Sequence, residues 1–447
     1  METNGAFLPD GGTTGRSLVL FEEDEAEAGM QAVREAVGVD VVTATGEEVA
    51  PAEGGGILFE SLGVAVVDAP PEQVLQAAGE AAILAVEPER IVYALEASQY
   101  APSETNGQAT LPQPVAPSLP VSPLGEAGGL GAEYLRGYRE AVLHLTDAVA
   151  SDTATAEAVI AAVDESQATW GLQVTKVVNC CRTAKGIRIA VLDTGFDLQH
   201  PDFAGRSITT QSFIVGQAVQ DGNGHGTHCI GTAMGAKCPG VRPRYGIAYE
   251  AEIYAGKVLS NAGSGSDSGI LAGIEWAVQN KCAVISMSLG APTRPGQSFS
   301  RVFERAARRA QQRGALIVAA AGNDSRRPGD IHPVSHPANC PSIMAVAAID
   351  VQGAIARFSN RGINPDGGQV DIAGPGVDVH SSWPLPTRYR RISGTSMATP
   401  HVAGIAGLYA EADPTARGAA LGRVLAGGAQ RLSLPSSDVG AGMVQAP

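Results

Sequence analysis

Three polar residues stand in sequence contexts that suit nucleophilic catalysis. Asp193 directly follows the apolar run 187–192, so we expect it at the carboxyl end of a buried parallel strand, where the functional groups of open sheets collect. Glycines frame His225 within residues 222–226, which leaves room for another backbone to approach the ring. Ser396 lies at the predicted start of a helix, where free N–H groups and the dipole favour a developing negative charge. Taken singly, Asp193 could be a loop cap and Ser396 an ordinary helix N-cap.

Together the three residues occur in the chain order Asp, His, Ser, which is the order of the catalytic triad in subtilisin. The surrounding motifs are Asp193-Thr194-Gly195, His225-Gly226-Thr227-His228 and Gly394-Thr395-Ser396-Met397-Ala398. On these motifs the chain resembles the subtilisin-like serine proteases (subtilases, peptidase family S8) from about Trp170 to Ala446. The resemblance implies a serine endopeptidase in which His225 accepts the Ser396 proton and Asp193 orients the imidazole. It also implies an oxyanion hole formed by Asn323 and the Ser396 N–H.

The resemblance further implies how a peptide binds. Substrate would lie as an added β-strand between residues 263–265 and 288–290. The residues implied to line this cleft are Gly263, Ser264, Gly265, Ile270, Ser288, Leu289, Gly290, Ala320, Gly322 and Ser335. Asp267 and Asp324 near the cleft could favour basic substrate side chains, although solvated loop acids are the more common case. Cys229 is four residues past His225 on the same helical face, and is either placed beneath the imidazole or is a small buried hydrophobe.

The elements that must position these residues alternate between strand and helix. The predicted buried parallel strands are 187–192, 283–285, 315–318 and 343–346, and the predicted crossover helices are 269–280, 298–313 and 400–411. This pattern predicts an α/β catalytic domain at 166–447, a doubly wound parallel sheet with helices on both faces.

A second, smaller unit precedes this domain at 17–97. Strands are predicted at 18–21, 39–43, 56–67 and 91–93, with helices at 25–37 and 71–79. The order βαββαβ is typical of an α+β ferredoxin-like sandwich, and the family resemblance implies an inhibitory propeptide. Residues 1–97 contain 19 acids and three arginines, a net charge of −16, whereas residues 98–447 carry +1. The unit is therefore either a solubilising domain or an acidic partner of the rest of its own chain.

Residues 98–165 join the two units. This segment begins with a Pro-rich linker and contains one predicted amphipathic helix at 133–150, and residues 1–16 form an N-terminal tail. If the unit at 17–97 is a propeptide, aligning its last strand places Leu95 in the S1 pocket and Val92 in S4. Cleavage is then expected after Leu95, with broad apolar specificity. The competing site is at 164–168, at the usual distance before the catalytic aspartate.

Composition excludes several other classes of protein. Hydrophobic residues make up 44% of the chain and charged residues 17%, as in globular proteins, and the net charge of −15 argues against a nucleic-acid partner. No apolar run approaches the roughly 18 residues of a membrane span. The N-terminus has no basic region followed by an apolar one, so we expect no Sec-type signal peptide and a cytoplasmic location or export by another route. The six cysteines include no CxxC metal pair.

No cofactor is expected to be required for catalysis. Many relatives bind calcium in a loop after the histidine helix, but residues 236–244 offer three cations and no carboxylate, so we expect that site to be absent, and other metal sites stay undetermined. The expected partners are protein or peptide substrates and the chain's own propeptide. Two alternatives remain: a maturation protease or peptide transamidase dedicated to one substrate, and a non-catalytic binding protein that keeps the protease fold.

Overall fold

The computed structural model describes residues 12–22, 25–44, 54–75, 82–95 and 163–447. Residues 1–11 of the tail expected at 1–16, the Pro-rich linker and the helix expected at 133–150 lie outside the described residues. All described segments belong to one compact unit. Within them, no helix is both long and apolar enough to cross a membrane.

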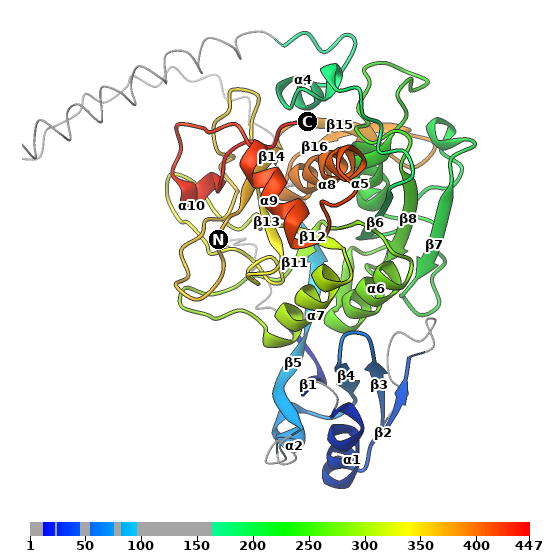
Figure 1. Cartoon of the computed structure of the whole chain (residues 1–447), viewed down its shortest axis with the longest axis vertical. Helices are drawn as coiled ribbons and strands as arrows, with labels where there is room; N and C mark the ends of the chain where they lie inside the picture. Colours follow the sequence, from blue (N-terminus) through cyan, green and yellow to red (C-terminus); the bar gives the residue numbers. More distant parts are fainter. Residues whose placement is uncertain (1–11, 23–24, 45–53, 76–81, 96–162) are drawn as a thin grey trace, which may run out of the picture. The chain divides into compact units, whose positions relative to one another are not determined.

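A seven-stranded parallel sheet forms the centre of residues 163–447 (Figure 1), in the order β14-β13-β12-β10-β6-β8-β7. Its strands are β6 (Arg188–Asp193), β7 (Ile208–Ser212), β8 (Glu252–Lys257), β10 (Val284–Met287), β12 (Leu316–Ala320), β13 (Met344–Ile349) and β14 (Ile372–Pro375). Within this sheet the chain begins with β6, continues with β7 and β8 on one side of it, and then forms β10, β12, β13 and β14 on the other side. The strand order therefore reverses between β6 and β10, which is where open α/β sheets bind their ligands. The doubly wound sheet expected from the sequence is confirmed, and Asp193 ends the strand at this switch point.

Helices cover both faces of this sheet. They are α4 (Trp170–Val174), α5 (His225–Met234), α6 (Asp267–Gln279), α7 (Arg301–Gln312), α8 (Thr395–Ala412), α9 (Ala419–Gly428) and α10 (Ser436–Val439), with short 3-10 turns at Val177–Asn179 and Pro201–Phe203. Ile189 and Val191 of β6 pack in one cluster with residues of α5 and α8. Ala190 and Leu192 pack in another with residues of α6 and α7. Because both faces are covered, β6 reads as a continuous apolar run.

Helix α8 differs from its expected form. It begins at Thr395, five residues before Pro400, so the proline lies inside the helix and not at its start. Proline has no N–H, so it cannot donate to the carbonyl four residues earlier, which belongs to Ser396. That carbonyl instead accepts a hydrogen bond from Ser288 Oγ at 2.8 Å. The proline thus frees a backbone oxygen that ties Ser396 to Ser288, the residue that follows β10.

The N-terminal unit is a mostly antiparallel sheet with two helices. Its elements are β1 (Thr13–Phe21), α1 (Ala26–Val37), β2 (Asp40–Thr43), β3 (Gly55–Phe59), β4 (Val64–Val67), α2 (Pro71–Val74) and β5 (Ile83–Ala94), and the sheet order is β5-β1-β4-β3-β2. The prediction of one strand at 56–67 was wrong, because the chain reverses between β3 and β4 at Gly63, whose φ of 64° suits glycine. β2 is an added edge strand parallel to β3. The predicted helix at 71–79 is described only to Leu75.

The N-terminal unit contacts helices α6 and α7. Leu18 and Leu20 of β1 pack in the same apolar cluster as these helices, while Val19 and Phe21 pack with α1 on the other face. Two short strands, β9 (Ser264–Ser266) and β11 (Leu289–Gly290), pair with β5. A separate antiparallel hairpin of β15 (Val379–Ser382) and β16 (Tyr389–Ile392) completes the fold.

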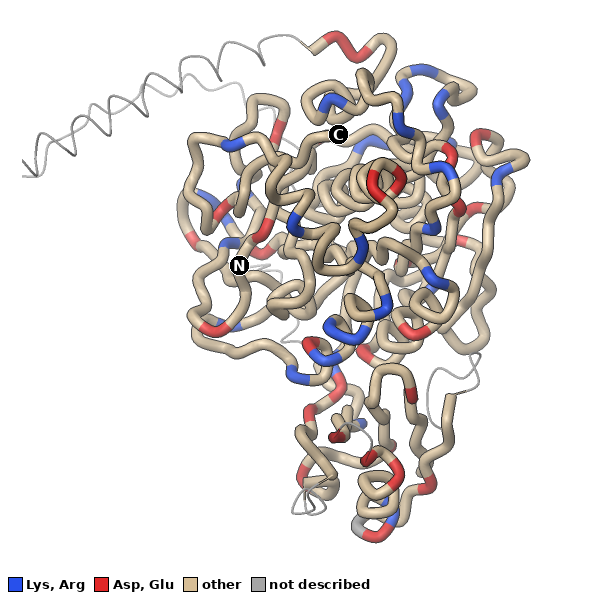
Figure 2. Tube along the Cα trace, in the orientation of Figure 1, with Lys and Arg blue, Asp and Glu red and all other residues tan. Residues whose placement is uncertain are grey.

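Two acids of β5 bond to the amino ends of these helices. Glu89 is 0% exposed and accepts hydrogen bonds from the Ser268 N–H at 2.9 Å and from Arg16 Nε at 2.6 Å. Glu87 accepts one from the Arg301 N–H at 2.7 Å. Helix amino ends carry unpaired N–H groups and the positive end of the dipole, so both carboxylates stabilise the contact. Although acids dominate the unit (Figure 2), these two are therefore not simply solvated.

We predict that Glu89→Ala, introduced together with Ser396→Ala so that all samples are uncut, lowers the free energy of unfolding of the full-length chain by about 1–3 kcal/mol, because it leaves the Ser268 N–H and the Arg16 guanidinium without their buried acceptor. Urea unfolding followed by circular dichroism measures this. Glu72→Ala removes an exposed acid of the same unit and serves as the matched control, with an expected change within about 0.5 kcal/mol. Equal effects of the two substitutions would show that Glu89 contributes only charge.

Candidate active site

Asp193 and His225 form a buried pair. Asp193 is the last residue of β6 and His225 the first of α5, and His225 Nδ1 lies 2.7 Å from Asp193 Oδ1. The exposed fractions of the two side chains are 1% and 0%. Burial by itself disfavours the imidazolium, but the Asp193 carboxylate outweighs this effect and raises the pKa of His225 well above its usual value of 6.5. His225 Nε2 has no hydrogen-bond partner among the described residues.

Ser396 is the second residue of α8 and is fully buried. Its Oγ donates to the Ser288 carbonyl at 3.0 Å, and no hydrogen bond joins it to His225 in the described structure. Cys229 shows that the two residues share one site, because its Sγ lies 3.9 Å from His225 Nδ1 and 3.5 Å from the Ser396 carbonyl oxygen. Catalytic hydrogen bonds are often loose until a reacting complex forms.

Asn323 binds the carbonyl oxygen of Leu95. Its Nδ2 donates to Leu95 O at 2.6 Å, while its Oδ1 accepts from the Thr395 N–H at 2.9 Å and from Thr395 Oγ1 at 2.8 Å. These two bonds fix which way the amide faces. A Cβ on Gly394 would lie 2.7 Å from Leu95 O, so only glycine lets the carbonyl approach this closely. The bond also expected from the Ser396 N–H to Leu95 O is not formed between these described residues.

The end of β5 lies as a strand between two segments of the domain at 163–447. On one side Ile91, Val92 and Tyr93 pair with β9, and the Ala94 N–H donates to the Gly263 carbonyl at 2.9 Å. On the other side, Tyr93 and Ala94 pair with β11 and the Leu95 N–H donates to the Ser288 carbonyl at 3.4 Å. The segments 263–265 and 288–290 singled out in the sequence therefore bracket an extended peptide, which is the end of this chain's own β5.

The other expected cleft residues divide into two groups. Gly290 touches the Leu95 side chain, since a Cβ there would lie 3.2 Å from Leu95 Cδ1. Ile270 and Leu289 are fully buried and share an apolar cluster with Val92. Ala320 ends β12, Gly322 donates its N–H to Thr395 Oγ1 at 3.2 Å, and Ser335 Oγ donates to Asp324 at 3.2 Å. These last three residues belong to the framework around the site.

Comparisons with known proteins agree with this geometry. A model of the subtilase family (Peptidase_S8) matches residues 184–442, more than half of the chain. The chain belongs to the subtilase family. It is 43% identical over 251 residues to M-protease of Shouchella clausii and to subtilisin Savinase of Lederbergia lenta, and 40% identical over 236 residues to subtilisin E of Bacillus subtilis. These matches cover 55%, 55% and 52% of this chain, and 60%, 85% and 58% of the respective relatives.

Both acids near the subtilase cleft are buried, which corrects the expectation of solvated loop acids. Asp267 is 0% exposed and Asp324 is 9% exposed. Asp324 Oδ2 accepts from Asn360 Nδ2 at 2.8 Å as well as from Ser335, so it is bonded within the domain. Asp267 pairs with a buried histidine, His336, which the sequence gave no reason to select.

Two further residues of the site were missed as functional groups in the sequence. Ser288 was expected only to line the cleft, but its carbonyl accepts from both Leu95 N and Ser396 Oγ, and its hydroxyl holds the Ser396 carbonyl. Thr395 orients the Asn323 amide. The position of Thr395 beside Ser396 in the motif could have indicated a role in the site. That role depends on Asn323, which is 72 residues away in the sequence.

Cys229 completes a cluster of possible metal ligands. Ligand atoms of Asp193, His225 and Cys229 lie within 4.8 Å of one another, and all three residues are buried. Desolvation raises the pKa of the Cys229 thiol to about 11, so the group is protonated at neutral pH. The placement beneath the imidazole, one of the two interpretations left open by the sequence, matches the contacts found.

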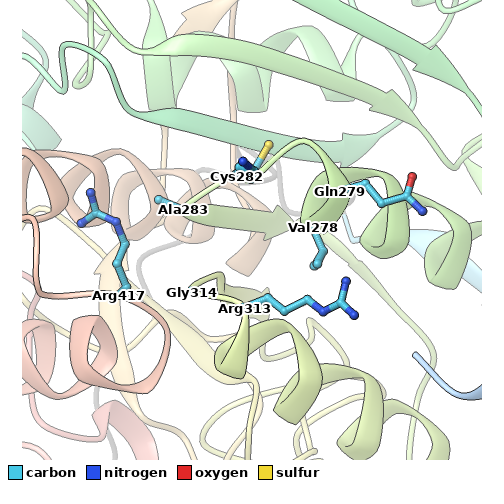
Figure 3. Close-up of a pocket in the computed structure, with 8 residues that line it drawn as sticks. Val278, Gln279, Cys282, Ala283, Arg313, Gly314 and Arg417 are labelled. Atoms are coloured by element: carbon cyan, nitrogen blue, oxygen red, sulfur yellow. The ribbon is translucent and has the colours of Figure 1, made fainter. Parts of the chain in front are cut away.

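A cavity of about 500 Å³ lies elsewhere on the subtilase domain. It is lined by Val278, Gln279, Lys281, Cys282, Ala283, Arg313, Gly314 and Arg417, several of which are labelled in Figure 3. These residues surround the start of β10, whereas Asp193 ends the parallel neighbour β6. The cavity thus lies at the amino ends of the parallel strands, whereas the candidate site lies at their carboxyl ends.

We predict that methylmercury bound to Cys229 inhibits peptide hydrolysis, because an adduct on a thiol 3.9 Å from His225 Nδ1 displaces the imidazole. Cys229→Ala should be resistant, while Cys181→Ala, which removes an exposed thiol, should remain sensitive. Hydrolysis rates and intact mass are measured together. Unchanged activity after confirmed modification of Cys229 would contradict the geometry.

Proposed function

We propose that this chain is a serine endopeptidase that hydrolyses peptide bonds with Asp193, His225 and Ser396 as its triad and Asn323 as an oxyanion-hole donor. One observation carries the proposal: the Leu95 carbonyl oxygen accepts a 2.6 Å hydrogen bond from Asn323 Nδ2 while its strand is paired on both sides. A peptide carbonyl held this way is ready for attack, because the donor already lies where an oxyanion would develop.

The chemistry follows from the residues in the site. Ser396 Oγ turns from the Ser288 carbonyl toward His225 Nε2, which takes its proton as the oxygen attacks the carbonyl carbon. The imidazolium that forms is stabilised by Asp193, and Asn323 stabilises the oxyanion. His225 then gives the proton to the leaving amine, which leaves an ester between Ser396 and the acyl group. Water attacks this ester while His225 accepts the water proton, and His225 returns the proton to Ser396 Oγ as the acyl group leaves.

Residues 17–97 act in this proposal as an inhibitory propeptide. The support is that residues 91–95, the end of β5 and the residue after it, lie between β9 and β11, and that Glu89 and Glu87 bond to the amino ends of α6 and α7 respectively. Leu95 as the residue before the cut gives a first cleavage between Leu95 and Glu96. Leu95 and Val92 are both apolar, which favours broad apolar specificity at S1 and S4.

The residues of the competing cleavage site near 164–168 contact parts of the domain outside the cleft. Ala168 forms a bridge with Arg244, and Glu165 forms an ion pair of 2.6 Å with Arg391. Neither contact involves the cleft. These contacts favour Leu95 as the first site and leave 164–168 for later trimming.

Catalysis in this proposal needs no cofactor, and residues 236–244 do not fit a calcium ion. The adjacent carboxylate, Asp202, accepts hydrogen bonds from Tyr245 Oη at 2.6 Å, from Tyr389 Oη at 3.0 Å and from the Gly240 N–H at 2.8 Å. Three donors thus occupy its oxygens, and the loop points an N–H toward them. Calcium requires several free oxygen ligands, which this arrangement does not offer.

We predict that Ser396→Ala and His225→Ala each reduce turnover by roughly 10⁶, the scale measured when these residues are removed from subtilisin. Asn323→Ala should reduce it by roughly 10²–10³, also a subtilisin value, with little change in substrate binding. All variants carry a cleavage site for an external protease within residues 98–110, so that the N-terminal unit is cut from every variant and removed in the same way. Hydrolysis of a reporter peptide ending in Ala-Leu and labelling by a fluorophosphonate are the measurements.

Retention of wild-type turnover by purified Ser396→Ala would refute the proposed triad. Labelling of the wild type at a serine other than Ser396, located by peptide mass mapping, would refute the assigned nucleophile.

A further inference from the structure

A buried aspartate–histidine pair lies beyond the apolar part of the cleft. Asp267 is the first residue of α6, and its Oδ1 lies 2.9 Å from His336 Nε2. The side chains of the two residues are 0% and 2% exposed. Neither residue takes part in the chemistry proposed above, so the pair needs another explanation.

The pair faces Arg90, which lies five residues before Leu95. The Arg90 N–H donates to Asp267 Oδ2 at 3.0 Å, which continues the β5–β9 pairing one residue beyond Ile91. The Arg90 guanidinium Nη1 lies 3.4 Å from His336 Nδ1 and 3.9 Å from Asp267 Oδ2. Both the backbone and the side chain of Arg90 therefore contact the pair.

The contacts determine where the proton of His336 lies. Nε2 faces a carboxylate and carries the proton, so Nδ1 of a neutral ring is an acceptor for the Arg90 guanidinium. Desolvation lowers the pKa of His336, which keeps the ring neutral. The pair then carries one negative charge in a buried place, where a positive side chain is favoured and a negative one is excluded.

Other groups around His336 do not alter this balance in a substrate complex. Glu87 Oε2 lies 4.0 Å from Arg90 Nη1, but it belongs to β5 itself and would be absent from a short substrate. From α7, the Phe303 ring packs on the edge of His336, with ring centroids 4.6 Å apart, and carries no charge. The charge that a substrate meets here comes from Asp267.

We infer that Asp267 and His336 form a subsite that selects a basic side chain at P6, six residues before the scissile bond, in peptide substrates. The inference rests on the proposed endopeptidase function and adds a requirement for charge to its apolar S1 and S4 preferences. Both groups belong to the catalytic domain, and any substrate paired with β9 and β11 in the register of β5 brings its P6 residue to the same place. The preferred substrates are extended peptides with arginine or lysine at P6 and apolar residues at P4 and P1.

The test compares reporter peptides that differ only at P6. The series acyl-X-Ile-Val-Tyr-Ala-Leu-reporter carries arginine, citrulline or glutamate at X, and the tetrapeptide acyl-Val-Tyr-Ala-Leu-reporter lacks the position. Citrulline keeps the shape of arginine and removes its charge. For the processed wild-type enzyme at about pH 8 we expect kcat/KM to be about tenfold higher with arginine than with citrulline, and lowest with glutamate.

Variants assign the effect to the pair. In Asp267→Asn the ratio of arginine to citrulline should fall to about one. Asp324→Asn, which changes another buried acid near the cleft that has no contact with Arg90, should keep the wild-type ratio. Because each ratio is measured within one enzyme, a general loss of activity in a variant does not affect it.

The pH dependence of the same ratio provides a second test, and it uses the wild-type enzyme, so it does not depend on whether a variant folds. Protonation of His336 makes Nδ1 a donor and places a positive charge opposite the P6 cation. Because desolvation lowers the pKa of His336 below its usual value of 6.5, the arginine-to-citrulline ratio should hold near pH 7 and decline only as the solution is made more acidic than pH 6.5. The tetrapeptide corrects for titration of the triad.

The outcomes separate this inference from the function on which it rests. If the wild type hydrolyses the tetrapeptide but shows an arginine-to-citrulline ratio of one, the subsite is refuted and the endopeptidase stands. A ratio that persists in Asp267→Asn also refutes the subsite. If no peptide is hydrolysed, the proposed function fails and the inference fails with it.

Discussion

The hydrogen bond from Asn323 Nδ2 to the Leu95 carbonyl is the contact on which the rest of the structure depends. It requires that β5 reach the switch point of the parallel sheet and stop there with one carbonyl facing the donor. The pairing of β5 with β9 and β11 fixes the register, and Thr395 fixes the direction of the amide. Because a strand pairs with β5 on each side, the peptide backbone has little freedom to shift. The position of the Leu95 carbonyl is therefore set by several backbone hydrogen bonds and not by Asn323 alone.

Helices α6 and α7 serve both parts of the chain. Their inner faces cover the parallel sheet, and they contribute to one apolar cluster with Leu18 and Leu20 of the N-terminal unit. Their amino ends bind Glu89 and Glu87, so apolar burial and charge act at the same contact. The same helix α6 supplies Asp267 at the end of the cleft. In the proposed function, docking of the acidic unit and recognition of an extended peptide therefore both depend on α6.

The sequence predicted best the residues whose neighbours reveal their role. A strand before Asp193, glycines around His225 and a helix after Ser396 are local signals, and the structure has each residue at the end or start of its element. The Asp267–His336 pair could not be predicted, because the residues are 69 positions apart and neither lies in a motif. The prediction of a helix starting at Pro400 was wrong because proline is tolerated within a helix whose freed carbonyl finds another donor.

The central claim is that this chain's own Leu95 occupies its active site as a substrate would. Intact-mass analysis with N-terminal sequencing, run side by side on purified wild type and Ser396→Ala, tests it most directly. We expect the wild type to be cut between Leu95 and Glu96, and the variant to keep all 447 residues. Fully active wild type that still begins at Met1, or the same cut in purified Ser396→Ala, would contradict the account.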